Sequence, residues 1–216
     1  MKLEQIQIQT NNIQKTTAYY KDVLELTILE KSSNSVTIKA GNSILEFVEN
    51  PQFNSIYHFA FNIPENKLDE AIKWCKSKID LIVIEDQNVI ANFENWNANA
   101  VYFYDNNGNL LEFIARHDLN NSQTEEFSSK SILNISEIGI VNENPLALGN
   151  QLIEKYGLNF FSKNDNSEFF SAIGDDEGLL ILVKPNRSWY PTQTPSESNE
   201  TAIKLENKGT TIDLKL

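Results

Sequence analysis

The chain has 216 residues, of which 40% are hydrophobic and 10% aromatic, and this is enough to build one large or two small domains. Its net charge of -12 and its pI near 4.6 exclude a nucleic-acid surface, because phosphate binding requires clustered lysines and arginines. No apolar run approaches the roughly 20 residues that span a bilayer, and the N-terminus lacks the apolar stretch of a signal peptide. We therefore expect a cytoplasmic protein that binds neither nucleic acid nor membranes.

Residues 1–50 predict a strand, a helix and three short strands. The first strand, LEQIQIQT, alternates so that Ile6 and Ile8 share one face while Gln5 and Gln7 share the other. The helix IQKTTAYYKDVLEL carries apolar residues at helical spacing. The strands LTILEKS, SVTIKAG and SILEFVEN follow, and Glu46 lies on the mixed face of the last one. This order is a βαβββ module.

Residues 56–116 repeat the same order. The strand IYHFAFNI places His58 and Asn62 opposite an apolar face, and the helix PENKLDEAIKWCKSK follows. The helix contains Cys75, the single cysteine, which excludes an internal disulfide. The strand LIVIED and the Asn-rich stretch QNVIANFENWNANA come next. The module ends in VYFYDNNGNLLEF, whose DNNG turn predicts an antiparallel hairpin with Glu112 in the middle of its second strand.

A polar segment, residues 117–131, predicts a linker, and residues 132–216 predict a third module with two further terminal strands. In this module Glu137 holds the place of Gln5, but no acid holds the place of Glu46, so we expect no second metal site there. The loop VKPNRSWYPT concentrates Lys184, Arg187, Trp189 and Tyr190. It could contact a ligand or pack the third module onto the others, and packing is the favoured interpretation.

Four polar residues occupy equivalent places in the first and last strands of the two complete modules: Gln5, Glu46, His58 and Glu112. If these modules pair about a pseudo-twofold axis and curve into half-barrels, their mixed faces line one cavity. A bound cation would offset the cost of burying carboxylates there. Imidazole with carboxylates suits Zn, Ni, Co, Mn or Fe(II). The alternative is a polar cavity without a metal, in which His58 is a structural histidine.

Residues 1–116 resemble the vicinal oxygen chelate superfamily, which groups glyoxalase I, extradiol dioxygenases, bleomycin-resistance proteins and fosfomycin-resistance enzymes. The stretch VYFYDNNGNLLEF is similar to the family pattern YFxDPDGNxLE, and YHFAFNI and the opening strand, turn and helix also match. The chain departs from the pattern at Asn106, Asn107 and Glu25. The resemblance implies an α+β fold of curved mixed half-barrel sheets, with residues 1–116 as a complete domain of two modules. The third module, residues 132–216, would then be an extra half-domain, whose open sheet edge favours a homodimer.

By position, the resemblance implies a glyoxalase I-like ligand set of Gln5, Glu46, His58 and Glu112. A glyoxalase-like lyase or isomerase would bind the vicinal oxygens of a small substrate on a divalent metal, with Glu112 or Glu46 moving the proton. Substrate contacts are expected from three residues on the same strand faces: Arg116, Gln7 and Asn62.

Two other functions stay open. The chain could sequester a small molecule in a metal-free cavity, as bleomycin-resistance proteins do. An extradiol-type dioxygenase with Fe(II) would need a second imidazole, and Gln5 stands in that place. The chain has only two arginines, Arg116 and Arg187, which counts against a thiol-tripeptide substrate held by its carboxylates.

Overall fold

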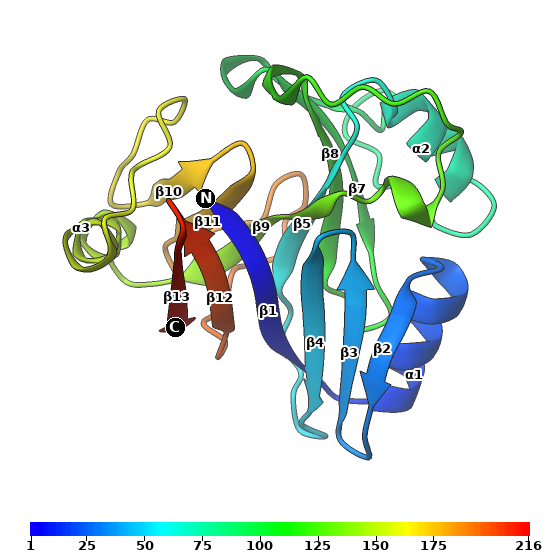
Figure 1. The fold of residues 1–216 in the computed structure, drawn as a ribbon, viewed down its shortest axis with the longest axis horizontal. Coiled ribbons are helices and arrows are strands. Elements are labelled where there is room, and N and C mark those ends of the chain that lie inside the picture. The colour runs from blue at the N-terminus through cyan, green and yellow to red at the C-terminus, as the bar shows by residue number, and fades with distance from the viewer.

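The computed structural model describes residues 1–216, which form one mixed sheet of thirteen strands with three α-helices on its outside (Figure 1). The central path of the sheet runs β2-β3-β4-β1-β9-β5-β8-β7-β6. No helix is long and apolar enough to cross a membrane. The expected α+β fold with a mixed sheet is confirmed.

The first module follows the predicted order. Its elements are β1 (Lys2–Thr10), α1 (Ile13–Ala18), a π-helical turn (Tyr19–Val23), β2 (Thr27–Lys31), β3 (Ser35–Ala40) and β4 (Ser43–Glu49). Asn12 caps α1, because its side chain accepts a hydrogen bond from the Lys15 amide. The apolar face expected from the alternation is buried, with Ile6 and Ile8 at most 1% exposed.

The second module is confirmed except for one strand. Its elements are β5 (His58–Ile63), α2 (Leu68–Cys75), β6 (Ala91–Phe93), β7 (Ala98–Tyr104) and β8 (Leu110–Arg116). The antiparallel hairpin of β7 and β8 forms as predicted, and Gly108 adopts a φ of 80° in its turn. The segment LIVIED makes only an isolated bridge between Leu81 and Phe103. It then turns back at Asp86 and Gln87, which have positive φ, and β6 lies in the Asn-rich stretch instead.

The third module and the terminal hairpin complete the chain. They consist of β9 (Asn134–Val141), α3 (Pro145–Tyr156), β10 (Phe170–Asp175), β11 (Gly178–Val183), β12 (Ala202–Asn207) and β13 (Thr210–Lys215). The expected strand LNFFSKN is reduced to a bridge between Phe160 and Ile173. The linker contains two short 3-10 turns (His117–Leu119 and Ser129–Ser131), and its Phe127 packs on Trp74 of α2.

The modules do not pair as the sequence analysis expected. Strand β5 pairs in parallel with β8 of its own module and antiparallel with β9, so the second module joins the third. Strand β1 pairs in parallel with β4 and antiparallel with β12, which lies beside it in Figure 1. Between β1 and β9 there is a single bridge, Leu3 to Ile135. The terminal hairpin therefore closes, within the chain, a sheet edge of the first module.

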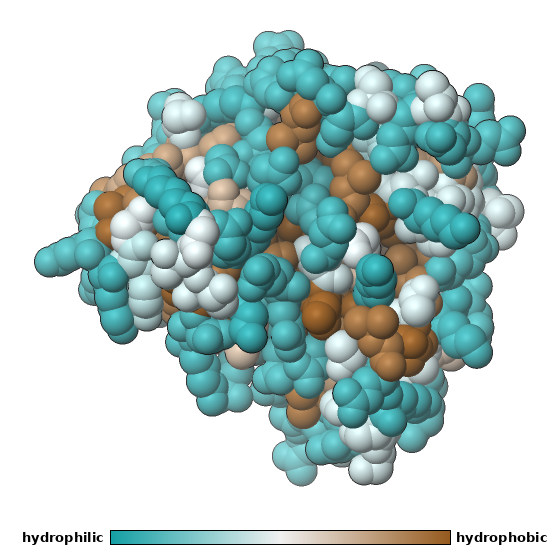
Figure 2. Space-filling view, in the orientation of Figure 1, coloured by the Kyte–Doolittle hydropathy of each residue, from teal (hydrophilic) through white to brown (hydrophobic).

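The hydrophobic core divides between the two faces of the sheet. The larger cluster lies on the face covered by the helices and contains Phe47, Phe59 and Phe113. A smaller cluster lies on the opposite face of the second and third modules and contains Ala60 and Ile114. Figure 2 shows that the face toward the viewer is mostly hydrophilic, with apolar patches over the region of β2–β4.

Candidate metal centre

A cavity of about 230 Å³ opens on the inner face of the second and third modules. Its lining includes three ionisable side chains from three neighbouring strands: His58 of β5, Glu112 of β8 and Glu137 of β9. Aromatic side chains supply most of the remaining wall: Phe93, Trp96, Tyr102, Phe170, Trp189 and Tyr190. Ile181 and Arg187 complete it. The cavity thus combines a polar group of possible ligands with apolar walls, as small-molecule sites do.

The register of the strands brings the three ionisable groups together. Ala60 of β5 is the register partner of Glu112 on one side and of Glu137 on the other. His58 precedes Ala60 by two residues and therefore projects from the same face. The potential ligand atoms of the three residues all lie within 4.8 Å of one another. The methyl group of Ala60 leaves the space above the middle strand free for them.

A β-bulge lies directly before Glu137 on β9. The register between β5 and β9 shifts after the pair Ala60 and Glu137, because the next pair is Phe61 and Ile135, which leaves Ser136 as the extra residue. A bulge of this kind re-aims the neighbouring side chains. Ile135 and Ile138 can consequently both enter the large core while Glu137 faces the opposite way.

His58 is held in the tautomer that can bind a metal. Its Nδ1 donates a hydrogen bond to the Leu110 carbonyl at 3.0 Å, so the lone pair of Nε2 is free, 3.8 Å from Glu112 Oε2. Burial lowers the pKa of His58 to about 4, and Arg187 contributes in the same direction. The imidazole is therefore neutral at physiological pH, which is the form that coordinates metals.

The two carboxylates are buried and close together. Burial raises the pKa of Glu112 well above its ordinary value, and the nearby Glu137 raises it further. Burial also raises the pKa of Glu137, although Arg116 opposes this. Glu112 Oε1 is buried without a hydrogen-bond partner. An unsatisfied, buried acid beside a neutral imidazole and a second acid is a donor set that fits a divalent cation.

Arg116 supports this centre from below. Its side chain is fully buried, and its guanidinium donates to Glu137 Oε1 through Nη2 and to Ser136 Oγ through Nε at 3.2 Å. Its Nη1 lies 3.5 Å from Asp176 Oδ1. Arg116 is not among the cavity-lining residues, so it fixes the Glu137 carboxylate instead of contacting a substrate. Asn62 is also buried outside the cavity, where its Nδ2 donates to the Asp176 carbonyl at 3.0 Å.

The other predicted ligands lie at a second hollow, of about 210 Å³, between the first module and the terminal hairpin; Gln5 lines this hollow, and Glu46 contacts its wall through Gln5 and Gln7. There Gln5 and Gln7 both donate through Nε2 to Glu46 Oε2, at 2.8 and 2.9 Å. Gln5, Gln7 and Glu46 are therefore separated from His58 and Glu112, and Glu46 has no place in their chemistry. Glu137 replaces them, a residue that the sequence analysis aligned with Gln5 but did not place in the site.

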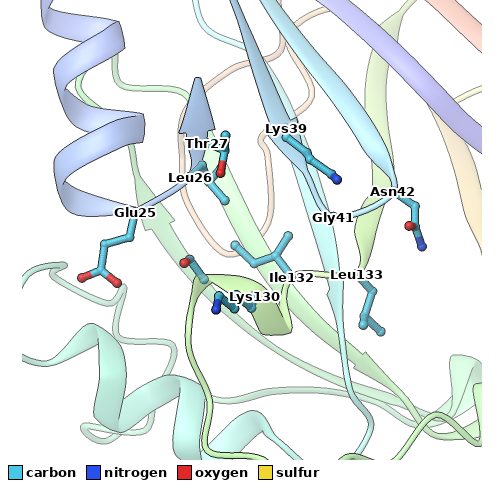
Figure 3. Close-up of a pocket in the computed structure, with 10 residues that line it drawn as sticks. Glu25, Leu26, Thr27, Lys39, Gly41, Asn42, Lys130, Ile132 and Leu133 are labelled. Atoms are coloured by element: carbon cyan, nitrogen blue, oxygen red, sulfur yellow. The ribbon is translucent and has the colours of Figure 1, made fainter. Parts of the chain in front are cut away.

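A third hollow carries no comparable chemistry. It measures about 390 Å³ and lies between residues 25–27, which follow the π-helical turn, the β3–β4 turn and residues 129–133 (Figure 3). Its only carboxylate is Glu25, which pairs with Lys78 Nζ at 2.6 Å, and Figure 3 shows Glu25 and Lys39 on opposite sides. Gly41 is required here, because a Cβ at this position would lie 2.1 Å from the Leu133 carbonyl oxygen.

Comparison with solved structures identifies proteins that share the fold of this chain. A candidate dioxygenase from Bacillus subtilis matches with a TM-score of 0.61 and 16% identity, over 98% of this chain and 68% of that chain. Lactoylglutathione lyase from Agrobacterium tumefaciens matches with a TM-score of 0.43 and 20% identity, over 51% and 90% of the two chains. For a Listeria monocytogenes fosfomycin resistance protein solved with Mn(II), the TM-score is 0.42 and the identity 18%, over 55% and 91%. No protein-family model and no curated protein matches the chain.

Proposed function

We propose that the cavity of the second and third modules binds one divalent metal ion through His58, Glu112 and Glu137. On this proposal the protein is a glyoxalase-like lyase or isomerase that acts on a small oxygenated substrate. The observation that carries the proposal is the buried Glu112 Oε1, which has no partner although ligand atoms of His58 and Glu137 lie within 4.8 Å. A cation at this point would satisfy all three side chains at once.

The donor set favours a borderline or hard ion. One imidazole nitrogen and two carboxylates suit Mn, Zn, Co, Ni or Fe(II), and three protein ligands leave positions open for substrate oxygens. When bound, such an ion would act as a Lewis acid for charge that develops on those oxygens. The cavity is smaller than the roughly 300–1,000 Å³ of sites for drug-sized ligands. This size favours a substrate smaller than a thiol tripeptide.

The side chains in and around the cavity would have different roles in metal binding and proton transfer. Arg116 holds the Glu137 carboxylate in place through a charge-assisted hydrogen bond, so Glu137 serves as a fixed ligand. No lysine or arginine pairs with Glu112, and its Oε1 has no hydrogen-bond partner, so we assign proton transfer to Glu112. Burial raises the pKa of this carboxyl group well above its ordinary value. Tyr102 is its cross-strand neighbour and stays protonated, because burial raises its pKa well above the ordinary value.

A metal-free binding protein is the second candidate. Arg116 already offsets the charge of Glu137, and aromatic walls are suited to holding an apolar molecule without chemistry. An extradiol-type dioxygenase is less well supported, because Glu137 stands where its second imidazole would be needed.

Metal titration tests the proposal. Chelator-treated protein is titrated with Mn(II), Zn(II), Co(II) or Ni(II) in a calorimeter, and one ion per chain is expected. Glu112→Gln and His58→Ala should each weaken metal binding by about 100-fold. Losing a residue that only supports a metal ligand costs about 10–100-fold, and loss of a ligand itself should cost no less than that. Glu46→Gln, in the second hollow, is the matched control and should bind as the wild type does. Wild-type protein that binds none of these ions would refute the metal-dependent function and leave the binding protein.

A further inference from the structure

An unpaired cation lies at the wall of the candidate metal cavity. Arg187 is among the lining residues, and its side chain remains exposed to solvent. It forms no ion pair with any carboxylate of the chain. Its guanidinium carbon lies 4.9 Å from the Phe170 ring, and its Nη1 makes one 3.3 Å hydrogen bond to the Ser188 carbonyl. Most of its five donors therefore have no protein partner.

The loop that carries Arg187 is held in place on both sides. The Ser196 amide donates to the Arg187 carbonyl at 2.8 Å, and the Trp189 amide donates to the Thr194 carbonyl at 2.9 Å. Trp189 is buried against Gly139 of β9, where a Cβ would lie 2.5 Å from Trp189 Cη2. The guanidinium is thus attached to a fixed backbone at the edge of the cavity, which lowers the entropy lost when it binds a ligand.

The charges around the cavity leave Arg187 without a counterion. Both arginines of the chain lie at this site, although the net charge of the protein is -12. Asp176 and Asp118 together offset Arg116 and Lys163, and a bound divalent ion would cancel Glu112 and Glu137. One positive charge then remains at the wall of an aromatic cavity. An anionic group on the ligand would neutralise it and use its fork of donors.

We infer that the ligand is a small, planar, unsaturated or aromatic molecule that carries a carboxylate or similar anionic group, and that Arg187 binds this group. The aromatic walls favour a flat apolar body, and the anion lies toward Arg187 while the oxygens of the molecule face His58, Glu112 and Glu137. This inference rests on the proposed metal site, because the metal fixes the opposite end of the molecule.

Two probes that differ only in the anionic group test the inference. Mn(II)-loaded protein is titrated without oxygen with 3,4-dihydroxybenzoate and with catechol, which share the chelating oxygens. We expect 3,4-dihydroxybenzoate to bind about tenfold more tightly than catechol, because its carboxylate would form a charge-assisted hydrogen bond at a partly exposed site. Added salt should remove this advantage. Arg187→Gln should remove the preference, while Arg187→Lys should keep part of it. Lys184→Gln, which removes the same charge from the same loop outside the cavity, should leave the preference unchanged.

The outcomes separate the two proposals. If Mn(II) and catechol bind but the carboxylate gives no advantage, or if the advantage persists in Arg187→Gln, the inference about Arg187 is overturned and the metal site stands. An equal loss in Lys184→Gln would also overturn it, because the effect would then come from general charge. If Mn(II) does not bind, both proposals fail.

Discussion

The candidate metal cavity, from here on the first hollow, and the second hollow beside Gln5 and Gln7 are built on the same plan and differ in their polar residues. In each, an opening strand is flanked by the parallel last strand of its own module and by an antiparallel strand from later in the chain. At matching register positions the first hollow holds His58, Glu112 and Glu137, and the second holds Gln5, Glu46 and Ala202. Only the first hollow therefore retains an imidazole and two carboxylates.

The residue in the middle of the opening strand accounts for the rest of the difference. In the first hollow it is Ala60, which leaves room above the strand, whereas in the second it is Gln7, whose amide donates to Glu46. Glu46 is satisfied by protein donors, while one oxygen of Glu112 has none. The fold thus supplies two equivalent hollows, and the polar partners of one carboxylate decide which hollow suits a cation.

The largest expected effect on stability concerns Arg116, the buried cation that pairs with Glu137 of the first hollow. Arg116→Met leaves the buried Glu137 without its counterion, whereas Asp176 keeps its ion pair with Lys163, and breaking a buried ion pair in this way costs about 3–5 kcal/mol. Urea unfolding of chelator-treated protein measures the loss. Lys204→Met, on β12 at the second hollow, is the matched control, and its effect should stay within about 0.5 kcal/mol. Equal losses in the two variants would contradict the assigned difference between the hollows.

A second variant tests the packing of Trp189, in the aromatic wall of the first hollow, against Gly139 of β9. Gly139→Val should cost about 1–3 kcal/mol in unfolding free energy, because the new side chain would overlap the Trp189 ring. Trp189 fluorescence should change at the same time. Ala202→Val places the same side chain on the inner face of the second hollow, on a strand in which valine is favourable. If Gly139→Val lowers the unfolding free energy no more than this control does, Trp189 does not pack on β9 as described.

The smallest expected effect is on the metal-free protein and has the opposite sign. Because the pKa of Glu112 is raised on folding, its carboxyl group favours the folded state at low pH, and this is lost as pH rises from the unfolded value near 4.5 through the raised folded pKa. The Glu112→Gln variant has no ionisable group at this position, so its stability does not fall in this pH range for this reason. In chelator at pH 7 the variant should be more stable than the wild type by about 0.5–2 kcal/mol. Added metal should reverse the order, because only the wild type binds it tightly.

A pH series of urea unfolding curves measures this prediction. The stability gained by Glu112→Gln in chelator should shrink as the pH approaches 4, where the wild-type carboxyl group is protonated. A gain that is independent of pH would show that packing, not ionisation, separates the two proteins.

Much of this arrangement can be predicted from the sequence, since strand alternation assigned His58 and Glu112 to the face that they occupy and the DNNG turn predicted the β7–β8 hairpin. The choice of partner module could not be predicted. The opening strands of the modules share one apolar face and one mixed face, so their pattern does not tell which edges meet. The bulge at Ser136 also has no reliable sequence signal, yet it places Ile135 and Glu137, two residues apart, on opposite faces of the sheet. Arg116 was a usable clue, because a buried arginine requires an acid and Glu137 is that acid.

Crystals soaked in Mn(II) and measured at the manganese absorption edge would show whether His58, Glu112 and Glu137 hold a metal ion. We expect one anomalous peak in contact with His58 Nε2 and the carboxylates of Glu112 and Glu137, and no peak between Gln5 and Glu46. A peak at Glu46, or a first hollow without manganese in crystals of protein that has been saturated with it, would refute the proposed metal site.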